Sequence, residues 1–158
     1  MAAPHPRTAG RVRPKAVCVC RDGDRILVNA AVDRVKGERY YGPLGGEIEF
    51  GEYAADAVAR ELREEIGVAI EEVQLLGVLE NVFTYEGTPG HEIVFVFDAR
   101  LADPSLYARA TLVGEESNGL TFVAQWLPLE TFAPGGPPLY PDGLYALLHA
   151  GRRARRDA

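Results

Sequence analysis

The sequence GGEIEFGEYAADAVARELREEIGV, residues 45–68, carries the clearest pattern in this 158-residue chain. In its second half, Val58, Leu62 and Ile66 recur every four residues, which predicts one apolar stripe along a helix. Gly67 is well placed to end that helix. Because an apolar stripe of this width packs against a sheet, the segment predicts a helix that covers a β-sheet.

Three glutamates, Glu61, Glu64 and Glu65, crowd the end of the same predicted helix, on an arc beside the apolar stripe. Like charges three and four residues apart weaken a helix, so their presence needs a reason. Carboxylate oxygens that converge at the rim of a core suit a hard divalent cation such as Mg²⁺. The alternative is a solvated acidic face, in which Arg60 pairs with Glu64.

Composition and charge limit the classes of protein to consider. The chain has 17 Lys and Arg against 23 Asp and Glu, a formal charge of −6, which argues against a broad basic surface for duplex nucleic acid. No apolar run is long enough to span a membrane, and the first residues lack the apolar core of a signal peptide, so a cytoplasmic location is expected. Cys18 and Cys20 are expected as buried, reduced thiols of one strand.

The domain organisation is expected to be simple: a flexible N-terminal tail over 1–13, a single domain over 14–150, and a basic C-terminal tail over 151–158. Within the domain, apolar runs flanking Asp22-Gly23 predict a β-hairpin.

The rest of the domain is expected to alternate between strands and helices. Loops are expected over 31–43 and 103–119. Strands are expected over 70–86, 91–101 and 120–129, and a short helix over 144–150. This order predicts an α/β (α+β) fold, a mixed sheet with helices packed on its faces.

The opening stretch also fits a longer pattern. Its fixed positions are Gly46, Glu52, Arg60, Glu61, Leu62, Glu64, Glu65, Gly67 and Val68. They resemble the Nudix box, G-x5-E-x7-R-E-U-x-E-E-x-G-U with U apolar, and every fixed position is filled. Pro43-Leu44-Gly45 and the IEFGE run also look like the family. One departure is Tyr53, which stands where the family often has a Thr or Ser that would cap the helix.

The resemblance implies a Nudix-type mixed β-sheet sandwiched between helices, across roughly 14–150. It also implies a hydrolase of nucleoside diphosphates linked to another moiety, X, such as a nucleotide sugar, a dinucleoside polyphosphate or a nucleoside triphosphate. Mg²⁺ or Mn²⁺ would be the cofactor. The positions that match metal ligands are the carbonyl of Gly46 and the carboxylates of Glu61, Glu64 and Glu65. Arg60 and Glu52 match the pair that orients these ligands.

The general base is left open by the same resemblance. Glu61 or Glu65 could serve from within the box, whereas other family members use a glutamate from a later loop. Glu115 and Glu116, in VGEESNG, are the candidates of that kind, and the alternative for both is an acidic loop surface. Glu92, on the strand after a turn, either points into a cleft or caps the strand end.

Substrate contacts must come from outside the box. Aromatic residues near it, Tyr40, Tyr41, Phe83 and Tyr85, are candidates to stack on a base. Tyr85 lies where a tyrosine resembles the mark of the diadenosine polyphosphate branch, although packing in a strand is the alternative. Arg39, in the expected loop before the box, is a candidate contact for a phosphate or for X.

Two other functions remain as alternatives at this point. The chain could be a nucleotide-binding regulator that keeps the fold without turnover. It could instead be an RNA 5′-end pyrophosphohydrolase, helped by its basic tails, although the acidic body makes nucleic acid an unexpected partner. The expected partner is a small nucleotide derivative, with no membrane, and a homodimer is one option for the oligomeric state.

Overall fold

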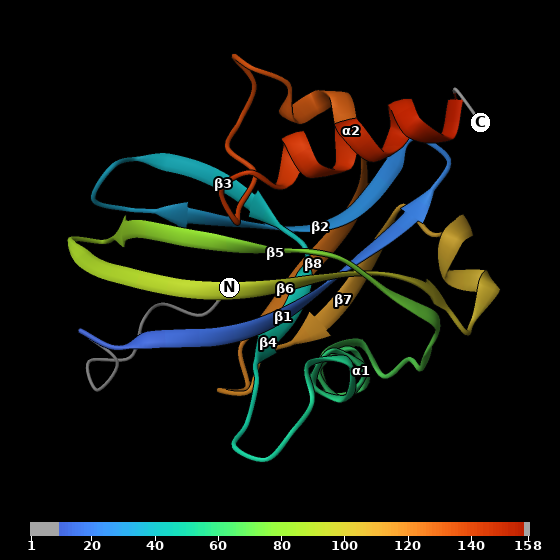
Figure 1. Ribbon diagram of the computed structural model, residues 1–158, viewed down its shortest axis with the longest axis horizontal. Coiled ribbons are helices and arrows are strands. Elements are labelled where there is room, and N and C mark those ends of the chain that lie inside the picture. Colours follow the sequence, from blue (N-terminus) through green and yellow to red (C-terminus); the bar gives the residue numbers. More distant parts are fainter. Residues whose placement is uncertain (1–9, 157–158) are drawn as a thin grey trace.

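The computed structural model describes residues 10–156 (Figure 1). The first half comprises β1 (Val12–Asp22), β2 (Arg25–Asp33), β3 (Glu38–Gly42), β4 (Leu44–Glu47), α1 (Ala54–Ile66) and β5 (Ile70–Tyr85). The second half comprises β6 (Thr88–Leu101), the 3₁₀ turn η2 (Pro104–Ala108), β7 (Thr111–Glu115), β8 (Thr121–Pro128), the 3₁₀ turn η3 (Leu129–Phe132) and α2 (Leu144–Arg156).

The sheet is mixed and divides into two parts. Strands follow the order β5-β6-β1-β2-β8-β7, with β3 beside β2 and β4 beside β1. The pairing of β1 with β6 is parallel, and the other strand pairings are antiparallel. β1 and β2 share only two residue pairs, Arg21 with Ile26 and Asp22 with Arg25. Beyond that corner the two parts of the sheet separate.

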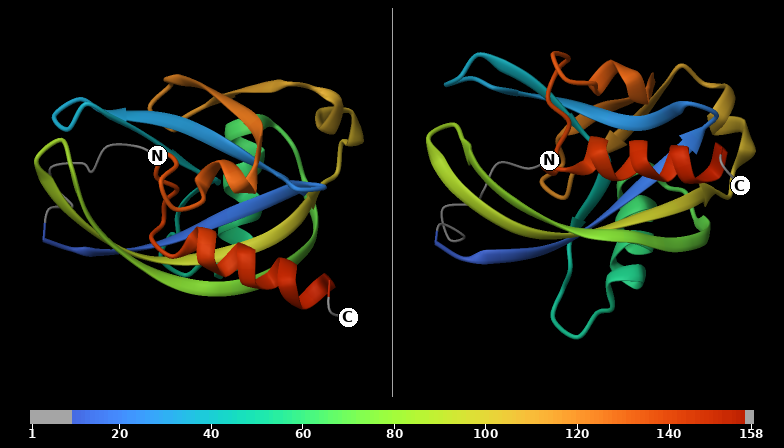
Figure 2. Two further views of the ribbon diagram at one scale, coloured as in Figure 1. Left: turned by 90° about the horizontal axis from the view of Figure 1, so that it is seen from above. Right: turned by 45° about the horizontal axis from the view of Figure 1, so that its top comes forward.

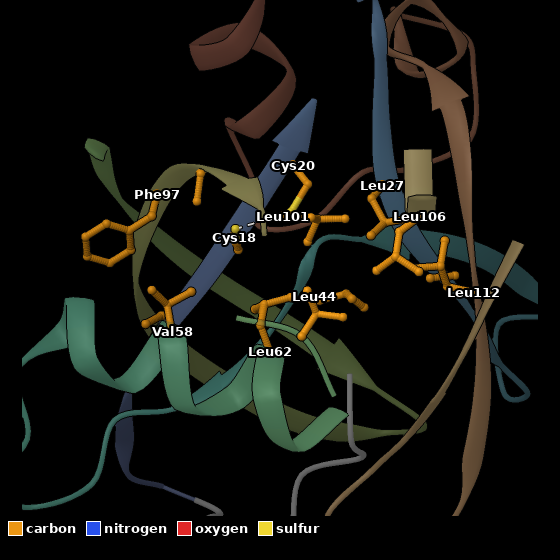
Figure 3. Close-up of a cluster of buried hydrophobic side chains, with 14 of the residues drawn as sticks. Cys18, Cys20, Leu27, Leu44, Val58, Leu62, Phe97, Leu101, Leu106 and Leu112 are labelled. Atoms are coloured by element: carbon orange, nitrogen blue, oxygen red, sulfur yellow. Dashed lines mark hydrogen bonds between the residues drawn. The ribbon is translucent and has the colours of Figure 1, made fainter. Parts of the chain in front are cut away.

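The helices lie on opposite sides of this sheet, α1 on one and α2 on the other (Figures 1 and 2). Alternation along β1 explains how one strand serves both. Cys18 and Cys20 pack in the core beneath α1, with Val58 and Leu62 of that helix (Figure 3). Val17 and Val19 pack in a second core, beneath α2. The predicted mixed sheet between helices is therefore confirmed.

Several local predictions are also confirmed. The chain turns at Gly23 between β1 and β2, and α1 ends at Gly67, which adopts φ 70°. Tyr53 precedes α1 and makes no side-chain cap, as the departure from the family pattern predicted. Cys18 and Cys20 are buried free thiols with their Sγ atoms 3.5 Å apart.

Two expected loops contain strands. Residues 31–43 complete the hairpin of β2 and β3, and residues 103–119 contain η2 and β7. In this hairpin the apolar alternation is hidden, because Val32 is exposed, Asp33 is buried and charged residues occupy the turn. β7 was not predicted because it is only five residues long, which is too short for a clear alternating pattern.

The two expected tails differ from the structure where it describes them. β1 already begins at Val12, and residues 1–9 lie outside the described part of the chain. α2 continues through residues 151–156 instead of ending at 150, because Ala and Arg favour helices and one glycine costs only about 1 kcal/mol. Within 10–156, no helix is both long and apolar enough to cross a membrane.

Candidate functional site

Arg60 of α1 organises the acidic end of the helix. Its guanidinium donates to both carboxylate oxygens of Glu52, at 2.8 and 3.0 Å, and to the backbone carbonyl of Glu47 at 3.1 Å. It also donates to Glu61 at 2.9 Å and to Glu64 at 3.3 Å. The hydrogen bonds from Arg60 hold the pKa of Glu52 below its usual range. Arg60 therefore fixes the carboxylates in one arrangement.

Two glycines of β4 let the helix approach the sheet. A Cβ on Gly46 would lie 2.3 Å from the carboxylate carbon of Glu61, so only glycine leaves room for that side chain. A Cβ on Gly45 would lie 2.1 Å from the carbonyl oxygen of Ala16, and Gly45 has φ 151°. The backbone of β4 is thereby pressed against both β1 and the carboxylate of Glu61.

Glu65 is the most buried of the three glutamates at the end of α1, with 8% of its surface exposed. Burial, followed by the negative charges of Glu116 and Glu61, raises the pKa of Glu65 to about 8. Glu116 lies in the turn after β7, where its amide donates to the carbonyl of Leu120 at 2.8 Å. The loop glutamate and the helix glutamates thus border one acidic groove, with Glu115 and Ser117 on its rim.

The donors of this groove fit a hard divalent cation. Carboxylates from Glu61, Glu64, Glu65 and Glu116 border it. Gly46, whose carbonyl matches a metal ligand of the box, borders it too. Among the described residues, no three acidic, His or Cys side chains are already gathered as a metal site. Glu61 and Glu64 are instead paired with the guanidinium of Arg60, at 2.9 and 3.3 Å.

The same groove has a basic side. Arg13 and Lys15 lie on one face of β1, Arg11 comes just before the strand at the same spacing, and all three border the groove. Arg11 pairs with Glu47 at 2.9 Å, and Arg13 pairs with Glu92 at 2.5 Å. Cationic groups therefore lie beside the carboxylates, where an anionic substrate would pass.

A cavity opens between the two parts of the sheet and continues the groove. Lys15, Gly45, Glu65 and Glu116 border both spaces. The remaining polar walls of the cavity come from every strand of the two hairpins and from the segment before α2, namely Asn29, Tyr40, Asn81, Glu92 and Tyr140. The cavity is thus lined with amides and tyrosines, and its volume of about 30 Å³ has room for a few water molecules.

The polar groups of the cavity are held in place. Glu92 is only 1% exposed, and its carboxylate accepts from Arg13 and, at 3.4 Å, from the amide of Asn81. Asn81 in turn accepts from the backbone amide of Asp142 at 3.1 Å. In contrast, the buried Oδ1 atom of Asn29 has no hydrogen-bond partner among the described residues. That oxygen is an acceptor available to a ligand.

The predicted substrate contacts are only partly brought together. Glu92 lines the cavity, whereas Tyr85 lies behind Tyr40, with ring centroids 6.1 Å apart. Tyr41 does not line the cavity, because alternation along β3 turns it onto Phe132. Arg39 is exposed on β3 and borders neither the groove nor the cavity, and both substrate contacts stay predictions.

Several residues of the site were not singled out from the sequence: Arg13, Lys15, Asn29, Asn81 and Tyr140. Arg13 was assigned to the N-terminal tail. The spacing of Arg11, Arg13 and Lys15, every second residue up to a strand, was the one available signal for the basic side of the groove.

Comparison with known proteins identifies the family. The model of the NUDIX domain matches residues 11–146. NAD-capped RNA hydrolase NudC of Mycobacterium tuberculosis is 32% identical over 108 residues, which cover 63% of this chain and 34% of that protein. RNA pyrophosphohydrolase of Ruthia magnifica is 26% identical over 143 residues, which cover 83% of this chain and 78% of that protein.

Solved structures show the same fold. A NUDIX hydrolase from Nitrosomonas europaea superimposes with a TM-score of 0.60 at 20% identity, covering 89% of this chain and 90% of its own. The chain spans about a third of the length of the NudC proteins that it matches. Because the family model covers most of the chain, as the box over 46–68 predicted, this protein belongs to the Nudix hydrolase family.

Proposed function

We propose that this protein is a Mg²⁺- or Mn²⁺-dependent pyrophosphohydrolase that cleaves a nucleoside diphosphate linked to another moiety, X. The observation that carries the proposal is the continuity of two spaces. The groove bordered by Glu61, Glu64 and Glu65 adjoins the cavity between the sheets, because four residues line both spaces. A phosphate chain in the groove and a nucleoside in the cavity would thus lie end to end.

The carbonyl of Gly46 and the carboxylates of Glu61, Glu64 and Glu65 would hold the metal. When bound, it neutralises phosphate oxygens and lowers the pKa of coordinated water. Arg60 and Glu52 position the carboxylates, because the two-pronged hydrogen bond between them fixes the guanidinium. Lys15, at the junction of groove and cavity, adds a positive charge for the phosphate chain.

One glutamate must accept a proton from the attacking water. Glu65 and Glu116 both line the junction between groove and cavity, whereas Glu115 is exposed on the rim. Glu116 is therefore the better placed of the two loop candidates, and Glu61 and Glu65 remain the candidates within the helix. Replacing Glu115 and Glu116 separately by glutamine would separate them, since only the base should carry the pH dependence of kcat.

The terminal nucleoside would bind at the cavity, whose walls must move apart to admit it because the cavity volume is only about 30 Å³. Tyr40 and Tyr140 offer aromatic surface, and the free acceptor of Asn29 suits an amino or amide N–H of a base. This arrangement favours an enzyme over a nucleotide-binding regulator, because the phosphate chain of the substrate would lie beside the proposed metal ligands. We also propose that residues 14–150 act as one domain, that the protein is cytoplasmic, and that a homodimer is one of its states.

RNA ends are the second candidate substrate, and two observations favour them. Relatives at 26–32% identity are named for RNA substrates. The row of Arg11, Arg13 and Lys15 lies beside the groove, where it could contact the backbone of a chain leaving the site. The net charge of the chain argued against nucleic acid as a partner, but the local charge beside the groove governs binding there. We therefore do not exclude nucleic acid as a partner.

The test is a substrate panel with the purified chain and Mg²⁺ or Mn²⁺. It would include ADP-ribose, NADH, diadenosine tetraphosphate, nucleoside triphosphates and RNA with a 5′-NAD or 5′-triphosphate end. We expect a nucleoside monophosphate or pyrophosphate product, with ¹⁸O from labelled water in one product. Binding of nucleotides without any product would support the regulator and reject the proposal.

A further inference from the structure

The segment between β4 and α1 presents an aromatic ring at the rim of the acidic groove. This segment loops out beyond the helix (Figure 1). Within residues 10–156, Phe50 is the most exposed of the large hydrophobic side chains, and it borders the groove. Single exposed hydrophobic residues are ordinary on a protein surface, so exposure alone carries little. What distinguishes Phe50 is its place on the groove and the way in which its turn is held.

Hydrogen bonds fix the turn that carries Phe50. The amide of Glu52 donates to the carbonyl of Glu49 at 3.1 Å, and the amide of Glu49 donates to the carboxylate of Glu52 at 3.0 Å. The same carboxylate accepts two hydrogen bonds from Arg60, at 2.8 and 3.0 Å. Because the backbone around Phe50 is already ordered, a ligand that covers the ring would spend little free energy on ordering this turn.

The turn begins beside the basic side of the groove. The amide of Ile48 donates to the carbonyl of Pro14 at 3.0 Å, which continues the pairing of β4 with β1 beyond the strand end. Phe50 follows two residues later, and Arg11 borders the same groove. The Arg11 side chain is 63% exposed. An exposed guanidinium and an aromatic ring on one groove suit the phosphate and the base of a nucleotide.

The groove has room for such a group. Its volume is about 510 Å³, against about 30 Å³ for the cavity between the sheets. Small-molecule sites commonly measure roughly 300–1,000 Å³. Phe50 borders the groove and not the cavity. A phosphate chain beside Glu61 and Glu64 therefore has space on the side away from the cavity, where X would lie.

We propose that Phe50 is a stacking platform for a nucleobase within X, so that the preferred substrates carry a nucleoside on each side of the pyrophosphate. The inference rests on the proposed function, because it names the chemical class of X at the same site. Every base has a π face, so stacking on Phe50 would favour a nucleobase without reading which base it is. A ribose or another sugar in that place has no such face and would gain nothing from the ring.

The first measurement tests the platform by binding alone. It compares two analogues in which a methylene group replaces the oxygen between the two phosphorus atoms, so neither can be hydrolysed: diadenosine diphosphate and ADP-ribose. They differ only in the second adenine. By calorimetry with Mg²⁺, we expect the native chain to bind the diadenosine analogue roughly 5- to 100-fold more tightly, the range measured for stacking one base on an aromatic side chain.

Variants assign that preference to the ring. Phe50→Ala should remove most of the preference while its affinity for the ADP-ribose analogue stays within about twofold, and Phe50→Tyr should retain the preference. Tyr53→Ala is the matched control, because Tyr53 is an aromatic residue of the same segment, 83% exposed, that does not border the groove. Circular dichroism would check that each variant is folded, as expected for exposed side chains.

The second measurement separates the two sources of such a substrate, a free dinucleotide and the end of an RNA. Steady-state kinetics would use diadenosine tetraphosphate, RNA with a 5′-NAD end, and ADP-ribose as the reference without a second base. In Phe50→Ala, a rise in KM for diadenosine tetraphosphate alone would assign the platform to small dinucleotides. A rise for the RNA alone would assign it to capped RNA ends, and kcat should change little in either case.

The outcomes distinguish failure of the platform from failure of the proposed function. If the binding preference disappears in Phe50→Ala but the native chain hydrolyses no substrate, the platform stands and the proposed function is rejected. Equal affinity of the native chain for the two analogues, or a preference that survives in Phe50→Ala, would overturn the platform even in an active enzyme. An equal rise in KM for ADP-ribose would overturn it too.

Discussion

The acidic groove and the neighbouring cavity are built in opposite ways. Most of the groove's acidic wall comes from one short stretch, 46–65, where a β-strand, a loop and a helix follow one another. The cavity draws its polar walls from five strands, α1, the turn after β7 and the segment before α2. Local sequence therefore encodes the part that would do the chemistry, whereas the part that would choose the terminal nucleoside depends on how distant segments meet.

The largest effect is expected in the acidic groove, which the local sequence encodes. Glu64→Gln and Glu65→Gln should each lower kcat by several orders of magnitude, because each removes a proposed metal ligand. The fold should survive in Glu64→Gln, since the Glu64 side chain is 56% exposed. Steady-state kinetics with circular dichroism would check this, and Asp56→Asn, an exposed carboxylate on the same helix, serves as control. Native activity in both glutamine variants would reject the groove as the site.

A smaller but still large loss is expected for Gly46→Ala. The added methyl group would lie 2.3 Å from the carboxylate of Glu61 and must displace it. We expect roughly a hundredfold loss in kcat/KM, in line with the loss of one preorganised polar group. Gly151→Ala, where a Cβ would meet nothing within 4 Å, should keep full activity. Equal activity of the two alanine variants would show that Glu61 need not stay over β4.

The cavity should respond in KM and not in kcat. Asn29→Ala removes the free acceptor from the wall while leaving the groove intact. We expect KM for a nucleotide substrate to rise by roughly tenfold, the size of one hydrogen bond to a ligand, with kcat changed little. A fall in kcat at constant KM would mean that groove and cavity cannot be separated as binding and reacting parts.

The smallest effect is expected in the pH dependence of stability. Backbone hydrogen bonds, first that from Lys36, lower the pKa of Asp33 below its ordinary value. A lowered pKa stabilises the fold above the pKa of the unfolded chain, and this contribution is lost as the pH falls through the folded-state pKa. Denaturant titrations should therefore show the native chain more stable than Asp33→Asn near neutral pH, with the difference shrinking in acid. A constant difference in stability across that pH range would contradict the lowered pKa of Asp33.

The same contrast explains what the sequence could and could not predict. α1 and its ends were predictable because the apolar stripe and Gly67 are local signals. The contact between Arg60 and Glu52 followed from the box, since both residues belong to it. Each of these features can be recognised from residues that lie close together in the sequence.

The cavity could not be predicted in the same way. Asn81 and Glu92 lie opposite each other only because β5 and β6 pair in one register, and Asn29 faces them only because the sheets part at the β1–β2 corner. Tyr40 and Tyr41 are adjacent, and a one-residue alternation decides which of them enters the cavity. Without the register, nothing in the sequence distinguishes them.

The corner between β1 and β2 has a mechanical consequence. These strands have 11 and 9 residues and diverge, over about 30 Å, from two residue pairs and the turn at Gly23, while Cys18 and Leu27 pack in one core that joins them. Because Gly23 has φ 61°, a bulkier residue would strain that turn and change the angle between the two strands. A small angular change there grows along the strands, so a substitution at the turn could alter substrate choice without touching any residue that meets the substrate.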